Sequence, residues 1–441
     1  MKRSIRLLCF LYVLCCTVFV VAQPYAIQHL GVENGLSNNF VLSMAQDKRG
    51  CIWVATEVGL NRFDGNGFTV YKQHNSEIAG DALNTLLYDE KEDVLWMGGK
   101  FGGLCAWEGK SGCFRTYQAR NGMKLENIVH LAKANDGGIW ITPRHSDPIY
   151  FDSRSHRFTS LSDMGIQLDC RSNLCAFADG DLLYVGHYRG GMSIIDLKKK
   201  TTCRMLHDPA VPQSLPGHSI YSLYKDRLGH LWVGTEWGLG LLDSSTGRFT
   251  VFRHVQGRTS SLVADHVYDI CETADGKLWI ACDVGGISIL DLSQITFKHP
   301  EEVCFENLLS AVTGKGLSSS NIRKVLQDSY GNIWIGNYSC GLDFISHRPP
   351  VFQICGDRPV YGMYRGEEGQ LWVGGENELL LYKNDSLAKR FDICCDMLCS
   401  YGWVAAIIDD GQGFLLLGLS DNGILRTELR TGKTERVPMG I

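Results

Sequence analysis

One sequence unit is repeated along this chain of 441 residues. Its clearest copy, residues 225–251, reads Asp-x-x-Gly, an apolar residue and Trp, then Gly, a polar loop, Gly-Leu, a short apolar run and Gly-x-Phe. The aromatic residue after the Asp/Gly turn recurs at Trp53, Trp96, Trp140, Tyr184, Trp232, Trp279, Trp334, Trp372 and Phe414. Nine units spaced about 44 residues apart cannot arise by chance, and such a period is typical of a repeat architecture.

Each unit contains four short runs suited to β-strands. In the first unit these runs are residues 41–46, 51–55, 60–63 and 68–72. Glycine with Asp or Asn separates them, as tight hairpin turns require. Four short strands per repeat of this length predict the blade of a β-propeller. No long helical pattern follows the signal region, so the sequence predicts an all-β fold with few helices.

The repeated aromatic residue invites a functional interpretation, which we reject. One aromatic side chain per unit, at the same place on a strand predicted to be buried, indicates packing between neighbouring blades. The Asp-x-x-Gly pairs are interpreted in the same way, as turn formers and not as catalytic acids.

The unit resembles the two-component regulator propeller repeat. Residues 33–64 are similar to its opening blade: they contain Glu33-Asn34-Gly35-Leu36-Ser37, Gly50-Cys51-Ile52-Trp53-Val54 and Gly59-Leu60-Asn61-Arg62-Phe63-Asp64. The similarity covers about residues 25–430. Units three, four and nine depart from the pattern, with Thr142-Pro143 in place of Gly-Thr and with Tyr184 and Phe414 in place of Trp.

The resemblance implies the periplasmic sensor region of Bacteroides-type hybrid two-component histidine kinases. In that family two seven-bladed rings precede a β-sandwich, a transmembrane helix and the kinase, receiver and DNA-binding parts. This chain ends after nine units, so it resembles only the N-terminal portion, truncated before the membrane and kinase parts. Kinase activity is expected only in the missing C-terminal part.

The predicted domains are a signal peptide over 1–22, a first seven-bladed propeller over 23–347 and two blades of an incomplete second propeller over 348–441. The signal peptide has a basic start, an apolar core and small residues before Gln23; an uncleaved anchor is the alternative. Residues 25–30 resemble the fourth strand of a blade and are expected to complete the last blade of the first ring. A single ring of eight or nine blades is the competing geometry.

Charge and cysteine content exclude several function classes. Loss of the signal peptide changes the net charge from −5 to −8, which argues against a nucleic-acid partner. Fourteen cysteines remain, most of them in strand-like runs, and we expect buried free thiols with one or two disulfides. Cys394, Cys395 and Cys399 form a cluster, but no histidine follows at zinc-site spacing. We therefore expect no metal and no cofactor.

Catalytic and nucleotide-binding motifs are not found in the sequence, so no catalytic residue is assigned. The loops that join the second and third strands of each unit are expected to surround the central channel. They are rich in aromatic and charged residues, which suits the binding of a glycan fragment. The ligand-binding candidates are Lys100, Arg144, His145, Tyr188, Arg189, Trp237 and Tyr338. Weaker candidates on the other channel-facing loops are Asn38, Asn39, Asn84, Asn127, His218, His266 and Asn321.

The sequence therefore favours an exported, periplasmic sensor that binds an oligosaccharide from polysaccharide breakdown. It would signal through a kinase on another chain or in a missing C-terminal region, and a homodimer is an open option. One alternative is a propeller-fold lyase or glycosidase, and another is a truncated scaffold without signalling. Two further options stay open for the site: the loops are merely solvated, or the ligand binds where two rings meet.

Overall fold

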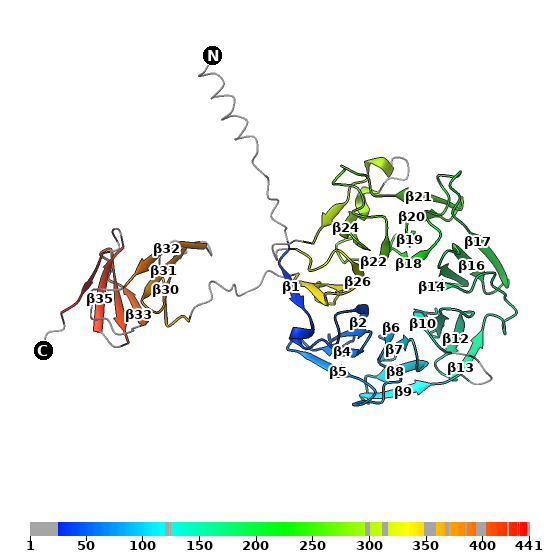
Figure 1. Cartoon of the computed structure of the whole chain (residues 1–441), viewed down its shortest axis with the longest axis horizontal. Coiled ribbons are helices and arrows are strands. Elements are labelled where there is room, and N and C mark those ends of the chain that lie inside the picture. The colour runs from blue at the N-terminus through cyan, green and yellow to red at the C-terminus, as the bar shows by residue number, and fades with distance from the viewer. Residues whose placement is uncertain are drawn as a thin grey trace, which may run out of the picture. The chain divides into compact units, whose positions relative to one another are not determined.

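The computed structural model describes residues 25–119, 123, 125–295, 300–310, 316–347, 359–366, 370–383, 386–393, 403–420, 423–429, 431 and 433–438. These residues form nine four-stranded antiparallel sheets. The chain divides into two compact units, Met1–Pro349 with seven sheets and Pro350–Ile441 with two. In the first unit the sheets surround a central channel as propeller blades (Figure 1). The expected all-β propeller fold is confirmed.

Each blade is a meander whose first strand is innermost and whose fourth strand is outermost. Blades one to three contain β2 (Val41–Gln46), β3 (Ile52–Thr56), β4 (Gly59–Phe63), β5 (Phe68–Tyr71), β6 (Leu83–Asp89), β7 (Val94–Gly99), β8 (Leu104–Glu108), β9 (Cys113–Tyr117), β10 (Ile128–Lys133), β11 (Ile139–Pro143), β12 (Ile149–Asp152) and β13 (Arg157–Ser160). Blades four and five contain β14 (Asn173–Asp179), β15 (Leu182–His187), β16 (Met192–Asp196), β17 (Thr201–Met205), β18 (Ile220–Lys225), β19 (Leu231–Thr235), β20 (Gly238–Asp243) and β21 (Arg248–Phe252).

Blades six and seven complete the ring, and the second unit holds blades eight and nine. Their strands are β22 (Val267–Glu272), β23 (Lys277–Cys282), β24 (Gly286–Asp291), β25 (Glu306–Leu308), β26 (Ile322–Gln327), β27 (Ile333–Asn337), β28 (Leu342–Ile345), β29 (Gly362–Arg365), β30 (Gln370–Gly374), β31 (Glu378–Lys383), β32 (Ser386–Asp392), β33 (Val404–Asp409), β34 (Phe414–Leu419), β35 (Gly423–Glu428) and β36 (Thr434–Arg436). The only helices among the described residues are three short 3-10 turns, η1 (Val32–Asn34), η2 (Leu292–Gln294) and η3 (Pro300–Glu302).

The N-terminal strand closes the ring. β1 (Ile27–Leu30) pairs antiparallel with β28 and supplies the fourth strand of blade seven. The inner strand β2 of blade one contacts both β6 and β26, so seven blades complete the circle. The expectation for residues 25–30 is therefore correct, and the alternative of an eight- or nine-bladed ring is wrong.

The repeated aromatic residues pack between blades, as predicted. Trp53 of blade one contacts the cluster that contains Leu86 of blade two, and Trp334 of blade seven contacts the one that contains Val41 of blade one. Trp53 and Trp232 are fully buried. The same arrangement joins Trp372 of blade eight to the apolar residues of blade nine. The core is thus a set of interfaces between successive blades and not one central cluster.

The aspartate of the repeat connects its turn to the buried tryptophan through hydrogen bonds. In blade five Asp226 Oδ1 accepts the backbone N–H of Leu228 and of His230, and Oδ2 accepts the indole N–H of Trp232 at 2.8 Å. Asp47 and Asp328 hold Trp53 and Trp334 in the same way, at 2.9 Å. The interpretation of these acids as turn formers is therefore correct.

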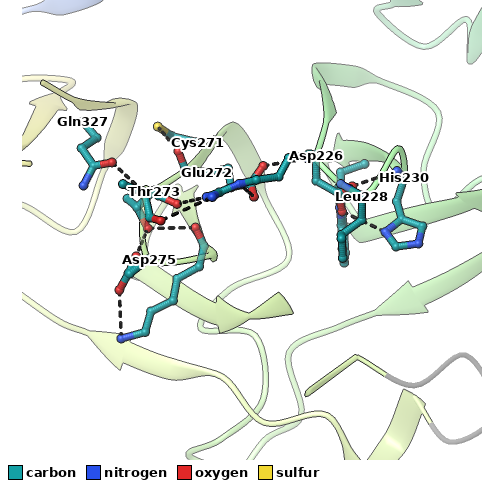
Figure 2. A network of polar contacts seen from close by, with 12 residues as sticks. Asp226, Leu228, His230, Cys271, Glu272, Thr273, Asp275 and Gln327 are labelled. Carbon is teal, nitrogen blue, oxygen red and sulfur yellow. Dashed lines mark hydrogen bonds and ion pairs between the residues drawn. The ribbon is translucent and has the colours of Figure 1, made fainter. Parts of the chain in front are cut away.

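Polar contacts connect blades five, six and seven at the turns after the inner strands (Figure 2). The side chain of Arg227 donates to Glu272 Oε1 at 2.6 Å and to the carbonyl oxygens of Thr273 and Ala274. The backbone N–H of Ala274 in turn donates to Gln327 Oε1 of the next blade at 2.7 Å. These turns lie at the opposite end of the inner strands from the loops predicted to bind a ligand, because alternate turns of a meander lie on opposite faces.

Several expectations fall outside the described residues. They are the signal peptide over 1–22, the start of the second ring near residue 351 and the cluster of Cys394, Cys395 and Cys399. The described cysteines, ten in all, are free thiols, and four of them are buried: Cys51, Cys105, Cys175 and Cys282. Among the described residues, no helix has the length and apolar character needed to cross a membrane.

Candidate functional site

The loops between second and third strands lie on the same face as the connections between blades. Their backbones are hydrogen-bonded together: Arg144 N–H donates to Asn127 O at 2.9 Å, and Tyr338 N–H donates to Asn321 O at 3.0 Å. Equivalent bonds link Tyr188 to Ser172 O at 2.6 Å and Asp283 to His266 O at 2.9 Å. Because each loop is fixed by backbone bonds, its side chains are free to vary without loss of the fold. We call this surface the loop face.

A ring of seven bulged residues lines the channel just below the loop face. In every inner strand of the seven blades the pairing register shifts at the second residue, so that residue has no partner in the ladder. A β-bulge of this kind redirects a side chain. All seven residues line one cavity of about 590 Å³. They are Leu42, Asn84, Val129, Leu174, Tyr221, Tyr268 and Arg323.

The bulged residues of blades one to four differ in chemistry from those of blades five to seven. Blades one to four supply three aliphatic residues and one amide, whereas blades five to seven supply Tyr221, Tyr268 and Arg323. Side chains from adjacent loops pack on these three. We define the channel-mouth cluster as Tyr221, His266, Tyr268, Asp283, Arg323 and Tyr338.

Aromatic stacking holds the channel-mouth cluster together. The guanidinium of Arg323 lies 3.6 Å from the ring centre of Tyr268 and 4.4 Å from that of Tyr338. The Tyr221 ring lies 4.6 Å from Tyr268 and 4.8 Å from His266. Cation–π contacts of this kind fix an arginine while its N–H edge stays open to a partner.

The polar atoms of the channel-mouth cluster are only partly satisfied. Asp283 Oδ2 lies 3.8 Å from a terminal nitrogen of Arg323 and 3.9 Å from His266 Nδ1, which is longer than a hydrogen bond. Nε of Arg323 and Nε2 of His266 are buried, and neither has a hydrogen-bond partner in the described part of the chain. Burial lowers the pKa of His266 and raises the pKa of Tyr221 to about 12, so both are uncharged near neutral pH. Orphaned buried donors at the rim of a cavity are what a binding site offers to a ligand.

The structure brings some of the sequence-predicted candidates together. Arg144 and Arg189 both approach the ring of Tyr188, with the guanidinium carbons 5.5 and 5.3 Å from its centre. Tyr338 belongs to the channel-mouth cluster and also packs edge-to-face on Phe40 at 5.0 Å. Trp237 packs against two histidines of blade five and its connection, His207 and His218, at 5.2 and 5.1 Å.

Two other candidates lie apart from these groups. Lys100 is exposed and its ammonium lies 5.8 Å from the ring of Phe101, which is 66% exposed, and His145 is exposed. Three of the weaker candidates stabilise the loops through hydrogen bonds. The side chains of Asn38, Asn39 and Asn321 accept the backbone N–H groups of Phe40, Val32 and Val284.

Sequence reasoning missed Tyr221, Tyr268 and Arg323, because they lie on inner strands where buried residues were expected. The repeat nevertheless contained a signal for these three residues. They occupy the same repeat position as Leu42, Asn84, Val129 and Leu174. A position that changes from aliphatic to aromatic and cationic in successive units is not determined by packing alone.

Two histidines, the fully buried His187 and the half-buried His130, predict an acid-sensitive ring. His187, the last residue of β15, contacts Asn173 and Ser193 at 3.1 and 2.8 Å, and burial lowers its pKa to about 4. His130 has a pKa lowered to about 4 by burial and by Lys324. Since the unfolded chain takes up these protons near the ordinary value of 6.5, stability is present above that pH and is lost as the pH falls toward 4.

The variant His187→Thr tests this, because Thr56 and Thr235 occupy the same position in blades one and five. Between pH 6 and 4.5 the free energy of unfolding of the variant is expected to fall with decreasing pH less steeply than that of the wild type. The two slopes should differ by about 1.4 kcal/mol per pH unit. Denaturant titrations at several pH values measure both slopes. Equal slopes would show that His187 is protonated in the folded ring.

Comparison with known proteins identifies the repeat. The family model described as two-component regulator propeller matches residues 35–58, 214–237, 261–283 and 316–339. Four segments of the chain are thus two-component regulator propeller repeats. The matched segments contain several loop-face residues, among them Trp237, His266 and Tyr338.

Two proteins similar to this chain are a histidine kinase and the extracellular domain of a hybrid two-component system. Over 41 residues, 9% of this chain and 3% of the relative, the chain is 46% identical to histidine kinase P4 of Formosa agariphila. The extracellular domain of a hybrid two-component system from B. thetaiotaomicron is 30% identical, with a TM-score of 0.64 over 95% of this chain and 55% of that one. The chain thus spans about half the length of that domain.

An enzyme is also similar to this chain in fold. Virginiamycin B lyase from Staphylococcus aureus is 13% identical and has a TM-score of 0.55 over 74% of this chain and all of the lyase. At this identity the likeness concerns the fold alone.

Proposed function

We propose that this chain is the ligand-binding propeller region of a periplasmic two-component sensor, and that a product of polysaccharide breakdown binds at its channel mouth. The observation that carries the proposal is the channel-mouth cluster at the rim of a cavity of about 590 Å³. Aromatic faces with a few convergent polar groups are what ligand pockets offer. Tyrosine rings stack on the apolar faces of sugars, while Arg323 and Asp283 can bond hydroxyl groups.

Signalling in this proposal needs parts beyond this chain. A ligand that binds one arrangement of the sensor better than another shifts the population toward it. The kinase would be supplied by a C-terminal region or by a separate chain, with a homodimer as the unit in which two kinases meet. The likeness to an extracellular sensor domain supports the proposed export.

The test is thermal unfolding of residues 23–441 in the presence of oligosaccharides from plant and host glycans. A ligand that binds only the folded state stabilises it by roughly 2.7 kcal/mol at a hundredfold excess over Kd. A raised midpoint with one oligosaccharide, recovered unchanged afterwards, is the expected result. No shift with any oligosaccharide would overturn the proposal that this region binds sugar.

Two tyrosines of blade seven provide a test of where the ligand binds. Tyr338 is 39% exposed on the loop face, and Tyr330 is 67% exposed in the turn after β26 at the other end of the inner strand. Tyr338→Ala is expected to weaken sugar binding at least tenfold, whereas Tyr330→Ala should leave it unchanged. Equal effects of the two substitutions would place the ligand elsewhere.

A lyase is the second candidate function. His266 with Tyr221 and Tyr268 at the channel mouth is a pairing that acid–base catalysis can use. Against it, burial raises the pKa of Tyr221 to about 12, far from neutral pH. Chromatography of the oligosaccharide after incubation decides between the two functions, because a lyase leaves shortened, unsaturated products.

A further inference from the structure

The charges around the channel mouth indicate which sugars it accepts. The outer pair is Arg323 with Asp283, 3.8 Å apart. The inner pair is Lys324 with Asp269, whose Nζ and Oδ1 are 2.8 Å apart. His266 adds no charge, because burial lowers its pKa. The two cations that line the cavity, Arg323 and Lys324, are thus each matched by a carboxylate.

A third carboxylate lies near enough for its charge to act on His266 and Tyr221. Glu236 lies at the turn between β19 and β20, where its oxygens accept the backbone N–H groups of His218 and Ser219 at 2.9 and 2.7 Å. Two neutral donors hold this carboxylate without cancelling its charge. Among the described residues, Glu236 thus adds a negative charge that no ion pair offsets.

An anionic ligand meets opposing forces here. A carboxylate or sulfate that accepts hydrogen bonds from Arg323 would also lie close to Asp283. Repulsion from Asp283 offsets part of the attraction to Arg323, and a change in the local dielectric scales both terms in the same way. The anion would also lose its hydration, which is costly when the net attraction is weak.

Hydroxyl groups suit the same atoms better. Arg323 has an unpartnered buried N–H, and Asp283 has oxygens too far from Arg323 and His266 for hydrogen bonds, so one side offers a donor and the other an acceptor. A hydroxyl both donates and accepts, and two adjacent hydroxyls bridge such a pair. We propose that the channel mouth selects uncharged sugars, with neighbouring hydroxyls held between Arg323 and Asp283, and rejects uronates and sulfated sugars.

This inference rests on the proposed function, and its test separates the two. Neutral trisaccharides of glucose, mannose and galactose are compared with their uronate counterparts by calorimetry and thermal shift on residues 23–441 at constant ionic strength. At least one neutral trisaccharide is expected to bind, at least tenfold more tightly than its uronate. Tighter binding of a uronate than of its neutral counterpart would overturn the inference and leave the sensor proposal standing. No binding by any trisaccharide would overturn both.

The variant Asp283→Asn is expected to change the specificity for neutral over charged sugars. Removal of this carboxylate leaves Arg323 without its counter-charge, so the preference for neutral sugar over uronate should shrink at least tenfold. Glu57→Gln is the matched control, because Glu57 is an exposed acid in the β3–β4 turn, the place that Asp283 occupies in the β23–β24 turn. An unchanged preference in Asp283→Asn would show that this pair does not select the ligand.

Discussion

Removal of residues 25–31, which contain the closing strand β1, is expected to lower the free energy of unfolding of the ring by about 3–5 kcal/mol. The loss combines the ladder between Ile27–Leu30 and β28 with the packing of Ile27 and Leu30 against two core clusters. Part of it is offset, because the unfolded chain no longer has to order these residues. Denaturant titration followed by circular dichroism measures the change.

The deletion also exposes the edge of β28. An unpaired edge strand recruits other chains, so the shortened protein should associate in a concentration-dependent manner, visible by light scattering. A synthetic peptide of residues 25–31 should restore stability when added, since an extended peptide can rejoin a free sheet edge. Removal of residues 433–438, which contain the outer strand β36 of blade nine, is the control, because that strand does not close the ring. Equal unfolding of the ring with and without residues 25–31 would contradict the role of β1.

The fold was predictable because the repeat encodes it redundantly. Each unit carries the same turn residues and one aromatic residue, so the failure of a single signal, such as Tyr184 in place of Trp, does not hide the blade. The closure of the ring could also be predicted from the sequence, since residues 25–30 resemble a fourth strand without the three strands that should precede it.

The candidate site was less predictable, for a physical reason. A bulge in each inner strand turns one residue toward the channel, yet the sequence around it still reads as an apolar strand. His187 and Asn337 show the opposite case: each is a polar residue directly before a loop-face candidate, yet each is the last residue of a strand and is fully buried. Asn337 donates to Ser318 and Asp343 inside blade seven. Polarity alone therefore does not separate a residue that binds a ligand from one that satisfies the fold.

Two tryptophans in one hairpin of blade five make this difference measurable. Trp232 is fully buried, whereas Trp237, five residues later, is 43% exposed on the loop face. Trp232→Ala should lower the free energy of unfolding by about 3–5 kcal/mol, the range for loss of a large buried aromatic side chain. Trp237→Ala should cost about 0.5 kcal/mol or less, as is usual for an exposed position.

The larger cost of Trp232→Ala has two components that a third variant separates. Trp232 contacts the core that includes Leu278 and Ile280 of the next blade, and its indole N–H donates to Asp226. Trp232→Phe keeps most of the packing but removes that donor, so it should cost about 1–3 kcal/mol. Similar losses for Trp232→Ala and Trp237→Ala would contradict the assignment of the repeated aromatic residue to packing between blades. In the expected outcome, stability depends on Trp232, and sugar binding depends on the loop face, where substitutions such as Trp237→Ala leave the ring intact.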